Sequence, residues 1–173
     1  QTLLANDGLI LGICNGFQAL IKSGLLPYGD ITKLNEGSPT LFRNNINRHV
    51  SHIARTRIAS NKSPWLAGFT PGECHSVAMS HGEGKFVVSE EVAKELFANG
   101  QIATQYVDLD GDPTMNGVYN INGSSFAIEG ITSADGRIFG KMGHSERSGA
   151  GLYKNVPGNL YQPIFEGGVD YFS

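Results

Sequence analysis

The sequence predicts an α/β fold in which helices flank a mixed sheet. Short apolar runs typical of strands alternate with two segments of helical periodicity. A turn sequence late in the chain joins two further strand-like runs and so adds an antiparallel piece. The 23 glycines are spread along the chain without a repeat, which indicates many short strands and turns within one domain, residues 1–173.

The first two predicted elements meet at residue 14. Residues 8–13, "GLILGI", form an apolar run without alternation, which is typical of a central parallel strand. Residues 15–23 have helical character, and we expect this helix to end at Gly24, with Pro27 as a stop just beyond. The chain is therefore expected to change from strand to helix within a very short span.

The middle of the chain contains two predicted strands and one helix. Residues 50–59 and 84–89 have the composition of strands. Ser89 is the expected N-cap of a helix over residues 90–99, which Gly100 closes. The apolar face of this helix is expected to consist of Val92, Leu96 and Phe97.

The last predicted elements include a hairpin. Residues 102–107 and 126–131 are predicted strands, and the turn sequence "SADG" joins the second of them to "RIFGKM", residues 137–142. A doubly wound domain normally has a strand and a helix ahead of its central strand, whereas here the candidate central strand comes first. We therefore expect the N-terminal part of the domain to be missing and the chain to be the C-terminal part of a larger polypeptide.

Charge and composition narrow the expected partners. The chain has 13 Lys and Arg against 16 Asp and Glu, so we expect neither nucleic acid nor a membrane surface as a partner. The two cysteines, Cys14 and Cys74, do not suggest a disulfide framework, which favours a reducing compartment, the cytoplasm. No apolar stretch approaches the roughly 20 residues that span a bilayer.

The segment Gly12-Ile13-Cys14-Asn15-Gly16 has the pattern of a nucleophile on a strand-to-helix turn. Such a turn is strained, and glycines two residues away on each side avoid collisions. The N-terminus of the following helix favours a thiolate at Cys14, and the backbone N–H of Asn15 can donate to an oxyanion. The alternative is a buried structural cysteine beside glycines that serve close packing.

A thiolate nucleophile needs a proton carrier, and two His-x-Glu pairs are candidates. His144 and Glu146 follow a predicted strand, where positions i and i+2 point to the same side, so Glu146 can orient the imidazole. The alternative for this pair is a solvated surface turn. His81 and Glu83 lie among glycines in "HGEG", and we expect that segment to be loose and His81 to lie farther from Cys14.

The remaining candidate motifs, for a metal, a phosphate or a docking partner, give weaker signals. His49-x-x-His52 and Cys74-His75 lack the partners of a zinc motif, so we expect no metal site. The chain has no GxxxxGK[ST] phosphate loop, so we expect no ATP site in this segment. The basic segment 43–57 is either a docking surface for another domain or a solvated strand face.

Together these motifs resemble a known family. Residues 12–18, "GICNGFQ", and His144-Ser-Glu146 are similar to the nucleophile elbow and the His-x-Glu pair of the class I, or triad, glutamine amidotransferases. The segments "SHGEGKF", "QIATQYVDLDGDPTMN" and "GKMGHSER" resemble more narrowly the glutaminase domains of phosphoribosylformylglycinamidine synthases. The similarity continues into the C-terminal "YKNVPGNLYQPIFEGGVDYF".

This resemblance implies a flavodoxin-like α/β fold and a glutaminase that supplies ammonia. Cys14 would attack the side-chain amide of glutamine and form a glutamyl thioester. His144 would protonate the departing ammonia and later activate water, with Glu146 orienting it. The residues expected to contact the substrate are Gln18, Asn15 and Gly12.

The resemblance also implies a partner and a cofactor outside this segment. Ammonia would travel to a synthase domain, in the same or a partner chain, where ATP, Mg²⁺ and formylglycinamide ribonucleotide are bound, and this segment itself would need no cofactor. The family carries a loop with a second oxyanion donor ahead of the elbow, and no such segment precedes Cys14. The alternatives are another cysteine hydrolase on the same elbow and a catalytically silent interaction module.

Overall fold

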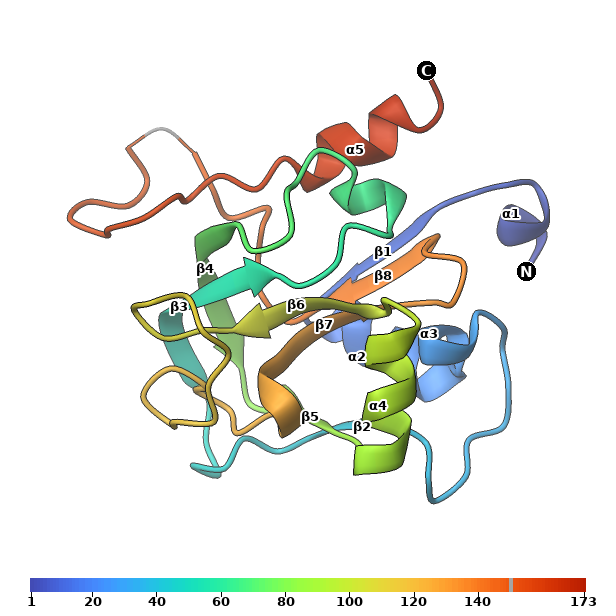
Figure 1. Ribbon diagram of the computed structural model, residues 1–173, viewed down its shortest axis with the longest axis horizontal. Helices are drawn as coiled ribbons and strands as arrows, with labels where there is room; N and C mark the ends of the chain where they lie inside the picture. The colour runs from blue at the N-terminus through green and yellow to red at the C-terminus, as the bar shows by residue number, and fades with distance from the viewer. Residues whose placement is uncertain (150) are drawn as a thin grey trace.

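A six-stranded mixed sheet forms the centre of the protein (Figure 1), for which the computed structural model describes residues 1–149 and 151–173. Its strands are β1 Ile10–Ile13, β3 Val50–Ile58, β4 Cys74–His81, β6 Ile102–Tyr106, β7 Ile128–Thr132 and β8 Ile138–Lys141. A separate antiparallel pair consists of β2 Thr40–Phe42 and β5 Lys85–Val87. The order across the large sheet is β1-β8-β7-β6-β3-β4.

The directions of the strands confirm the expected mixed sheet. β1 runs parallel to β8, with Ile13 opposite Lys141, and the remaining neighbours are antiparallel. β7 and β8 form the predicted hairpin. The parallel pair brings the start of the chain against a strand near its end, and both strands finish at the same edge of the sheet.

Helices cover both faces of this sheet. They are α1 Thr2–Ala5, α2 Asn15–Ser23, α3 Leu25–Tyr28, α4 Glu90–Ala98 and α5 Ile164–Asp170, with the 3₁₀ turns η1 Pro64–Leu66 and η2 Ser125–Ala127. Figure 1 shows α2, α3 and α4 below the sheet, and α5 with η1 above it. In the part of the chain that the structure describes, no helix is long and apolar enough to cross a membrane.

The core is divided by the sheet into two apolar clusters. Ile138 packs in the cluster that contains Phe17 of α2, whereas its neighbour Phe139 packs in the cluster that contains Ile164 of α5. Successive strand residues face opposite sides, so β8 is buried on both faces. A side chain at Gly140 would overlap the Phe17 ring, so this glycine lets α2 lie close against the sheet.

The local signals at two helix ends are confirmed. α2 ends at Gly24, whose φ of 81° is left-handed and suits a residue without a Cβ. Ser89 caps α4, since its hydroxyl accepts a 3.3 Å hydrogen bond from the N–H of Val92.

Two details of the helices differ from the expectation. Pro27 does not end the helical region. It lies inside the short helix α3, where Leu26 has non-helical dihedral angles. Phe97 is 42% exposed, and the buried residues of α4 are Ala93 and Leu96. Val92 and Leu96 thus pack against the core as predicted, whereas Ala93 takes the place expected for Phe97.

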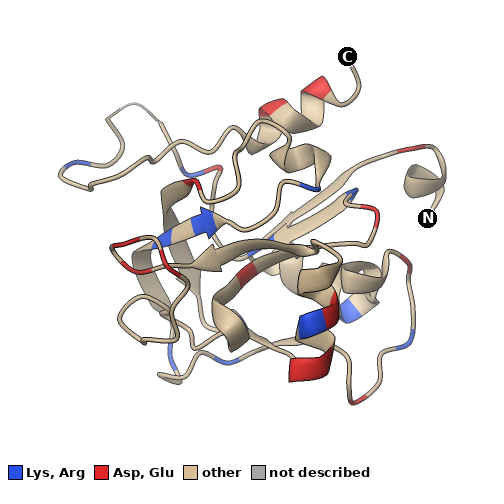
Figure 2. Ribbon diagram, viewed as in Figure 1, with Lys and Arg blue, Asp and Glu red and all other residues tan. Residues whose placement is uncertain are grey.

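The basic segment 43–57 runs into β3, where Figure 2 shows its charges beside an acidic loop. The guanidinium of Arg55 donates to the carbonyl oxygen of Leu109 at 2.8 Å, in the loop that carries Asp108 and Asp110. Part of the segment is thus engaged within the chain.

Candidate active site

Cys14 occupies the turn between β1 and α2, as the sequence predicts. Its φ of 53° and ψ of −105° are unusual for a residue with a side chain, so the backbone is strained at this point. The N–H of Cys14 donates to the carbonyl oxygen of Lys141 at 2.8 Å, which extends the pairing of β1 with β8. The neighbouring strand therefore holds the strained residue in place.

The two glycines that flank Cys14 play different parts. A Cβ at Gly12 would lie 2.5 Å from Leu20 Cδ1 and 2.8 Å from the backbone of Gly16, so only glycine fits there. A Cβ at Gly16 would meet nothing within 4 Å. The expectation that both glycines relieve collisions is right for Gly12 and wrong for Gly16.

The Cys14 sulfur lies in a half-buried setting against β4. Sγ is 3.5 Å from the carbonyl oxygen of Ser80. Burial raises the pKa of the thiol, while the N–H of Asn15 and the charge of Arg147 lower it by less. The N–H at the start of α2 does favour the thiolate, as expected. Desolvation outweighs it, so the pKa of Cys14 is raised overall and the neutral thiol is favoured.

His144 and Glu146 form a hydrogen-bonded pair just beyond the end of β8. His144 Nδ1 is 2.6 Å from Glu146 Oε1, and the His144 side chain is largely buried. The other ring nitrogen, Nε2, is buried and has no hydrogen-bond partner among the described residues. A buried nitrogen without a partner is unfavourable and is available to an incoming group.

The structure brings the elbow and the His144 pair to the same edge of the sheet. The N–H of His144 donates to the carbonyl oxygen of Ala78 at 2.8 Å, and Cys14 Sγ contacts Ser80, two residues further along β4. Cys14 follows directly on β1, and His144 lies three residues beyond the end of the parallel strand β8, with the two strand ends in register. The two residues are 130 positions apart in the chain, so this proximity comes from the sheet.

Gln18 is tied to a loop of the protein. Its side-chain amide donates to the carbonyl oxygen of Glu83 at 2.5 Å, which links α2 to the segment after β4. Its role as a substrate contact remains a prediction, as do those of Asn15 and Gly12.

The "HGEG" segment is held firmly, contrary to the expectation that it is loose. His81 is the last residue of β4 and its Nδ1 lies 3.2 Å from Asn44 Oδ1. The backbone N–H of Gly84 donates to the same oxygen, and a Cβ at Gly84 would strike the His81 ring. Burial lowers the pKa of His81 to about 4, so its imidazole is neutral at pH 7.

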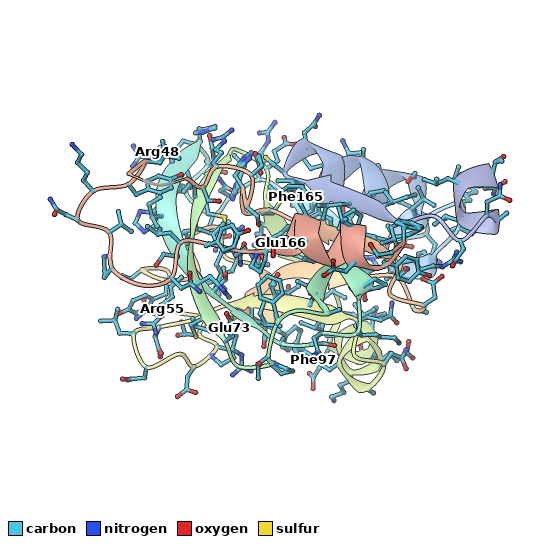
Figure 3. The ribbon with its side chains drawn as sticks, turned by 90° about the horizontal axis from the view of Figure 1, so that it is seen from above. Arg48, Arg55, Glu73, Phe97, Phe165 and Glu166 are labelled. Carbon is cyan, nitrogen blue, oxygen red and sulfur yellow. The ribbon has the colours of Figure 1, made fainter. Side chains whose placement is uncertain are left out.

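A cavity of about 200 Å³ opens beside the His144–Glu146 pair. It lies between the turn after β8 and the start of α5, where Figure 3 shows Phe165 and Glu166. The lining residues are Ser145, Glu146, Ser148, Tyr161, Gln162, Pro163, Phe165 and Glu166.

The histidines and cysteine considered as metal ligands have other neighbours. His49 Nε2 lies 3.1 Å from Ser80 Oγ, and His75 Nε2 lies 3.0 Å from Glu73 Oε1. Within residues 1–149 and 151–173 no three His, Cys, Asp or Glu side chains are placed to hold a metal ion.

The sequence patterns missed three residues around Cys14 and His144. Ser80 and Ala78 take part through backbone carbonyls, which carry no side-chain signal. Arg147, which follows the His-x-Glu pair, is close enough to favour the thiolate at Cys14. Its place directly after Glu146 was the available signal.

Comparisons with known proteins agree with this arrangement. The profile of the CobB/CobQ-like glutamine amidotransferase domain matches residues 1–172. The chain is 36% identical over 157 residues to the phosphoribosylformylglycinamidine synthase subunit PurQ of Chlorobaculum tepidum, covering 90% of this chain and 62% of that protein. It is 34% identical over 168 residues to the same subunit of Salinibacter ruber, covering 97% of this chain and 65% of that one.

A solved structure has the same fold. The structure of PurLQS from Thermotoga maritima superimposes with a TM-score of 0.71 at 25% identity, covering 99% of this chain and 66% of that chain. The α/β expectation is thereby confirmed. Against the PurQ of Rhodopseudomonas palustris strain HaA2, 34% identical over 142 residues, the matched part covers 82% of this chain and 55% of the relative. The chain thus spans between about half and two thirds of the length of these relatives.

Proposed function

The chain belongs to the CobB/CobQ-like glutamine amidotransferase family, and from that premise we propose that it is the glutaminase part of a phosphoribosylformylglycinamidine synthase. The observation that carries the proposal is the buried, unpartnered Nε2 of His144, whose other nitrogen is bound to Glu146. Such a nitrogen, at the same sheet edge as a strained cysteine, is suited to take and return a proton.

The first half of the proposed reaction forms a thioester. The Cys14 thiol gives its proton to His144 Nε2, and the sulfur attacks the side-chain carbonyl carbon of glutamine. The carbonyl oxygen becomes an oxyanion, to which the N–H of Asn15 donates. The C–N bond then breaks, and the nitrogen takes the proton from His144 and leaves as ammonia.

The second half releases glutamate. His144 takes a proton from water, the hydroxide oxygen attacks the thioester carbon, and the C–S bond breaks. The sulfur of Cys14 recovers its proton from His144, and Glu146 holds the imidazole in the required orientation throughout. The raised pKa of Cys14 fits this scheme, since a resting thiol needs a base beside it.

The ammonia is used by a synthase partner in this proposal. There it converts formylglycinamide ribonucleotide to formylglycinamidine ribonucleotide, with ATP and Mg²⁺ bound by the synthase and no cofactor bound by this segment. The similarity of this chain to the PurLQS structure supports a synthase partner. A cytoplasmic location follows from the same proposal.

The decisive test changes Cys14 to Ala in the full-length enzyme. Glutamine-dependent synthesis is expected to be lost and ammonia-dependent synthesis to remain, because free ammonia bypasses the thioester. Initial rates with each nitrogen source measure this. Cys74→Ala is the matched control, since Cys74 lies at the far end of β4, and both rates should persist there. Equal loss of both activities in Cys14→Ala would contradict the proposal.

A further inference from the structure

Two charged side chains are fully buried beside His144. Glu129 on β7 is 1% exposed, and Lys141 on β8 is 0% exposed. Burying a charged group costs several kcal/mol unless hydrogen bonds compensate for it. Among the described residues the two form no ion pair with each other or with a third group, so an apolar pair would fill the same space at lower cost.

Glu129 holds the peptide that precedes His144. Its Oε1 accepts a hydrogen bond from the N–H of Gly143 at 2.5 Å, and its Oε2 accepts one from the hydroxyl of Thr104 on β6. A Cβ at Gly143 would lie 2.9 Å from Glu129 Oε1 and 2.7 Å from Val77 Cγ1. Glycine therefore lets the carboxylate sit directly against the backbone.

Lys141 holds the residue that follows His144. Its Nζ donates to Ser145 Oγ at 2.7 Å and to Gln162 Oε1 at 2.9 Å. The Ser145 hydroxyl donates in turn to Gln162 Oε1 at 2.6 Å. This closed triangle fixes the turn after His144 to the segment ahead of α5.

We propose that Glu129 and Lys141 are positioning residues, which hold the backbone N–H of Gly143 and the side chain of Ser145 on either side of His144 and so keep its imidazole aimed at the elbow. This inference rests on the proposed glutaminase function. The N–H of His144 itself is paired with β4, so the three consecutive residues 143–145 are each held by a different element.

The charges of Glu129 and Lys141 explain why neutral polar residues do not hold the residues around His144. Hydrogen bonds with one ionised partner are shorter and about twice as strong as neutral ones. Catalytic side chains must be held within about 0.5 Å of the productive geometry, and a displacement of about 1 Å can cost 10²-fold in rate. The strong bonds of Glu129 and Lys141 restrict the peptide on which that geometry depends.

The experiment compares three variants in the full-length enzyme with its synthase partner. Glu129→Leu should lower the kcat of glutamine hydrolysis about 10²-fold and leave KM for glutamine almost unchanged, because the imidazole is misplaced while the substrate contacts persist. Glu129→Gln should have a kcat between those of Glu129→Leu and the wild type, since an amide oxygen still accepts from Gly143 but forms a weaker hydrogen bond than a carboxylate. Thr132→Val is the control on the same strand, because the buried Thr132 hydroxyl has no partner in the described chain, and it should behave like the wild type.

A gentler variant keeps the test valid if Glu129→Leu does not fold. Thr104→Val has nearly the same shape and removes the hydroxyl that donates to Glu129, so kcat should fall while ammonia-dependent synthesis persists. The melting temperature should drop by less than in Glu129→Leu, because Glu129 keeps its bond to Gly143. Lys141→Met should also lower kcat with KM preserved. Wild-type kcat in folded Glu129→Leu or in both other variants, or a change confined to KM, would overturn the positioning role.

Failure of the positioning role can be told apart from failure of the proposed function. In the first case the wild-type enzyme hydrolyses glutamine and Cys14→Ala does not, whereas the variants at Glu129, Thr104 and Lys141 match the wild type. In the second case the wild-type enzyme itself shows no glutamine hydrolysis that depends on Cys14.

Discussion

At the scale of single residues, the strained backbone of Cys14 and the pairing of His144 with Glu146 are the central features. A side chain held at φ 53° costs of the order of 1–3 kcal/mol, and the 2.8 Å hydrogen bond to Lys141 helps to maintain it. The strain presents the sulfur at the end of the sheet instead of within the core.

Changing Glu146 to Gln should lower glutamine hydrolysis strongly, on the order of 10²- to 10⁴-fold in kcat. An amide can donate to Nδ1 of His144, which favours the tautomer with its proton on Nε2, and that tautomer cannot take the thiol proton. Steady-state kinetics with glutamine measure the loss. Ammonia-dependent synthesis is the control and should be unaffected, and a kcat within a few-fold of the wild type would contradict the assigned role.

The depressed pKa of His81 makes stability depend on pH. Because the folded-state pKa is about 4 and the unfolded value about 6.5, the unfolded chain binds more protons between these values. Stability should therefore fall as the pH drops from about 6.5 toward 4, by up to about 3 kcal/mol from this residue. Charged or titratable groups that face it include Glu129, His49 and His144.

Urea unfolding at several pH values checks this prediction. His81→Asn removes the titrating ring and should flatten the decline, and the exposed His52→Gln should not. The stability of His81→Asn should still decline somewhat at low pH, because burial also lowers the pKa of His75. Equal pH dependence in the wild type and His81→Asn would show that His81 is not the cause.

The sequence predicted the members of the candidate site better than their electrostatics. Cys14, His144 and Glu146 stand in local patterns that could be read directly. The net rise in the thiol's pKa depends on burial partly by β4, a segment 60 or more residues away, which no local pattern reveals.

At the scale of elements, the close contact between β1 and α2 depends on one glycine. Gly12→Ala would push its methyl group into the backbone of Gly16, so we expect a loss of about 1–3 kcal/mol in the free energy of unfolding. Gly16→Ala meets no atom and lies within α2, where alanine is favoured by roughly 0.5–1 kcal/mol.

Thermal and urea unfolding of the two variants give a matched comparison. Gly12→Ala should melt below the wild type and Gly16→Ala at or above it. Similar destabilisation of both would mean that the turn itself, rather than the approach of α2 to β1, requires glycine.

Strand β4 was missed because its pattern is atypical. "CHSVAMSH" mixes histidine, serine and small residues, and its burial alternates only over residues 77–81, because Ser76 is buried as well. The outer part is covered by a distant segment, since the N–H of Ser76 donates to the carbonyl oxygen of Asn159 at 2.8 Å. Alternation is lost where both faces of a strand are covered, so the segment that covers Ser76 interrupts the pattern in the first half of β4. The helix ends, by contrast, were predictable because Gly24 and Ser89 act locally.

At the scale of the whole molecule, the candidate site depends on the complete sheet. The elbow contacts β8 through Lys141 and β4 through Ser80, and these strands lie at or near opposite ends of the sheet order. The sheet must therefore curl so that its two sides meet at Cys14. No local part of the chain holds the site by itself.

Loss of glutamine hydrolysis and loss of tertiary structure should therefore coincide. Activity and near-ultraviolet circular dichroism, followed together through a urea titration of the full-length enzyme, are expected to give one midpoint. Activity lost at a clearly lower denaturant concentration would indicate that the site melts separately from the sheet.

The parallel pairing of β1 with β8 also determines when the site can form during synthesis of the chain. β1 is synthesised more than 120 residues before β8, so it has no parallel neighbour until residues 138–141 have been made. Until then Cys14 lacks the Lys141 carbonyl that accepts its N–H, and His144 has not been made. In the proposed reaction, a nascent chain is therefore unable to hydrolyse glutamine until its synthesis has passed Glu146, the partner of His144.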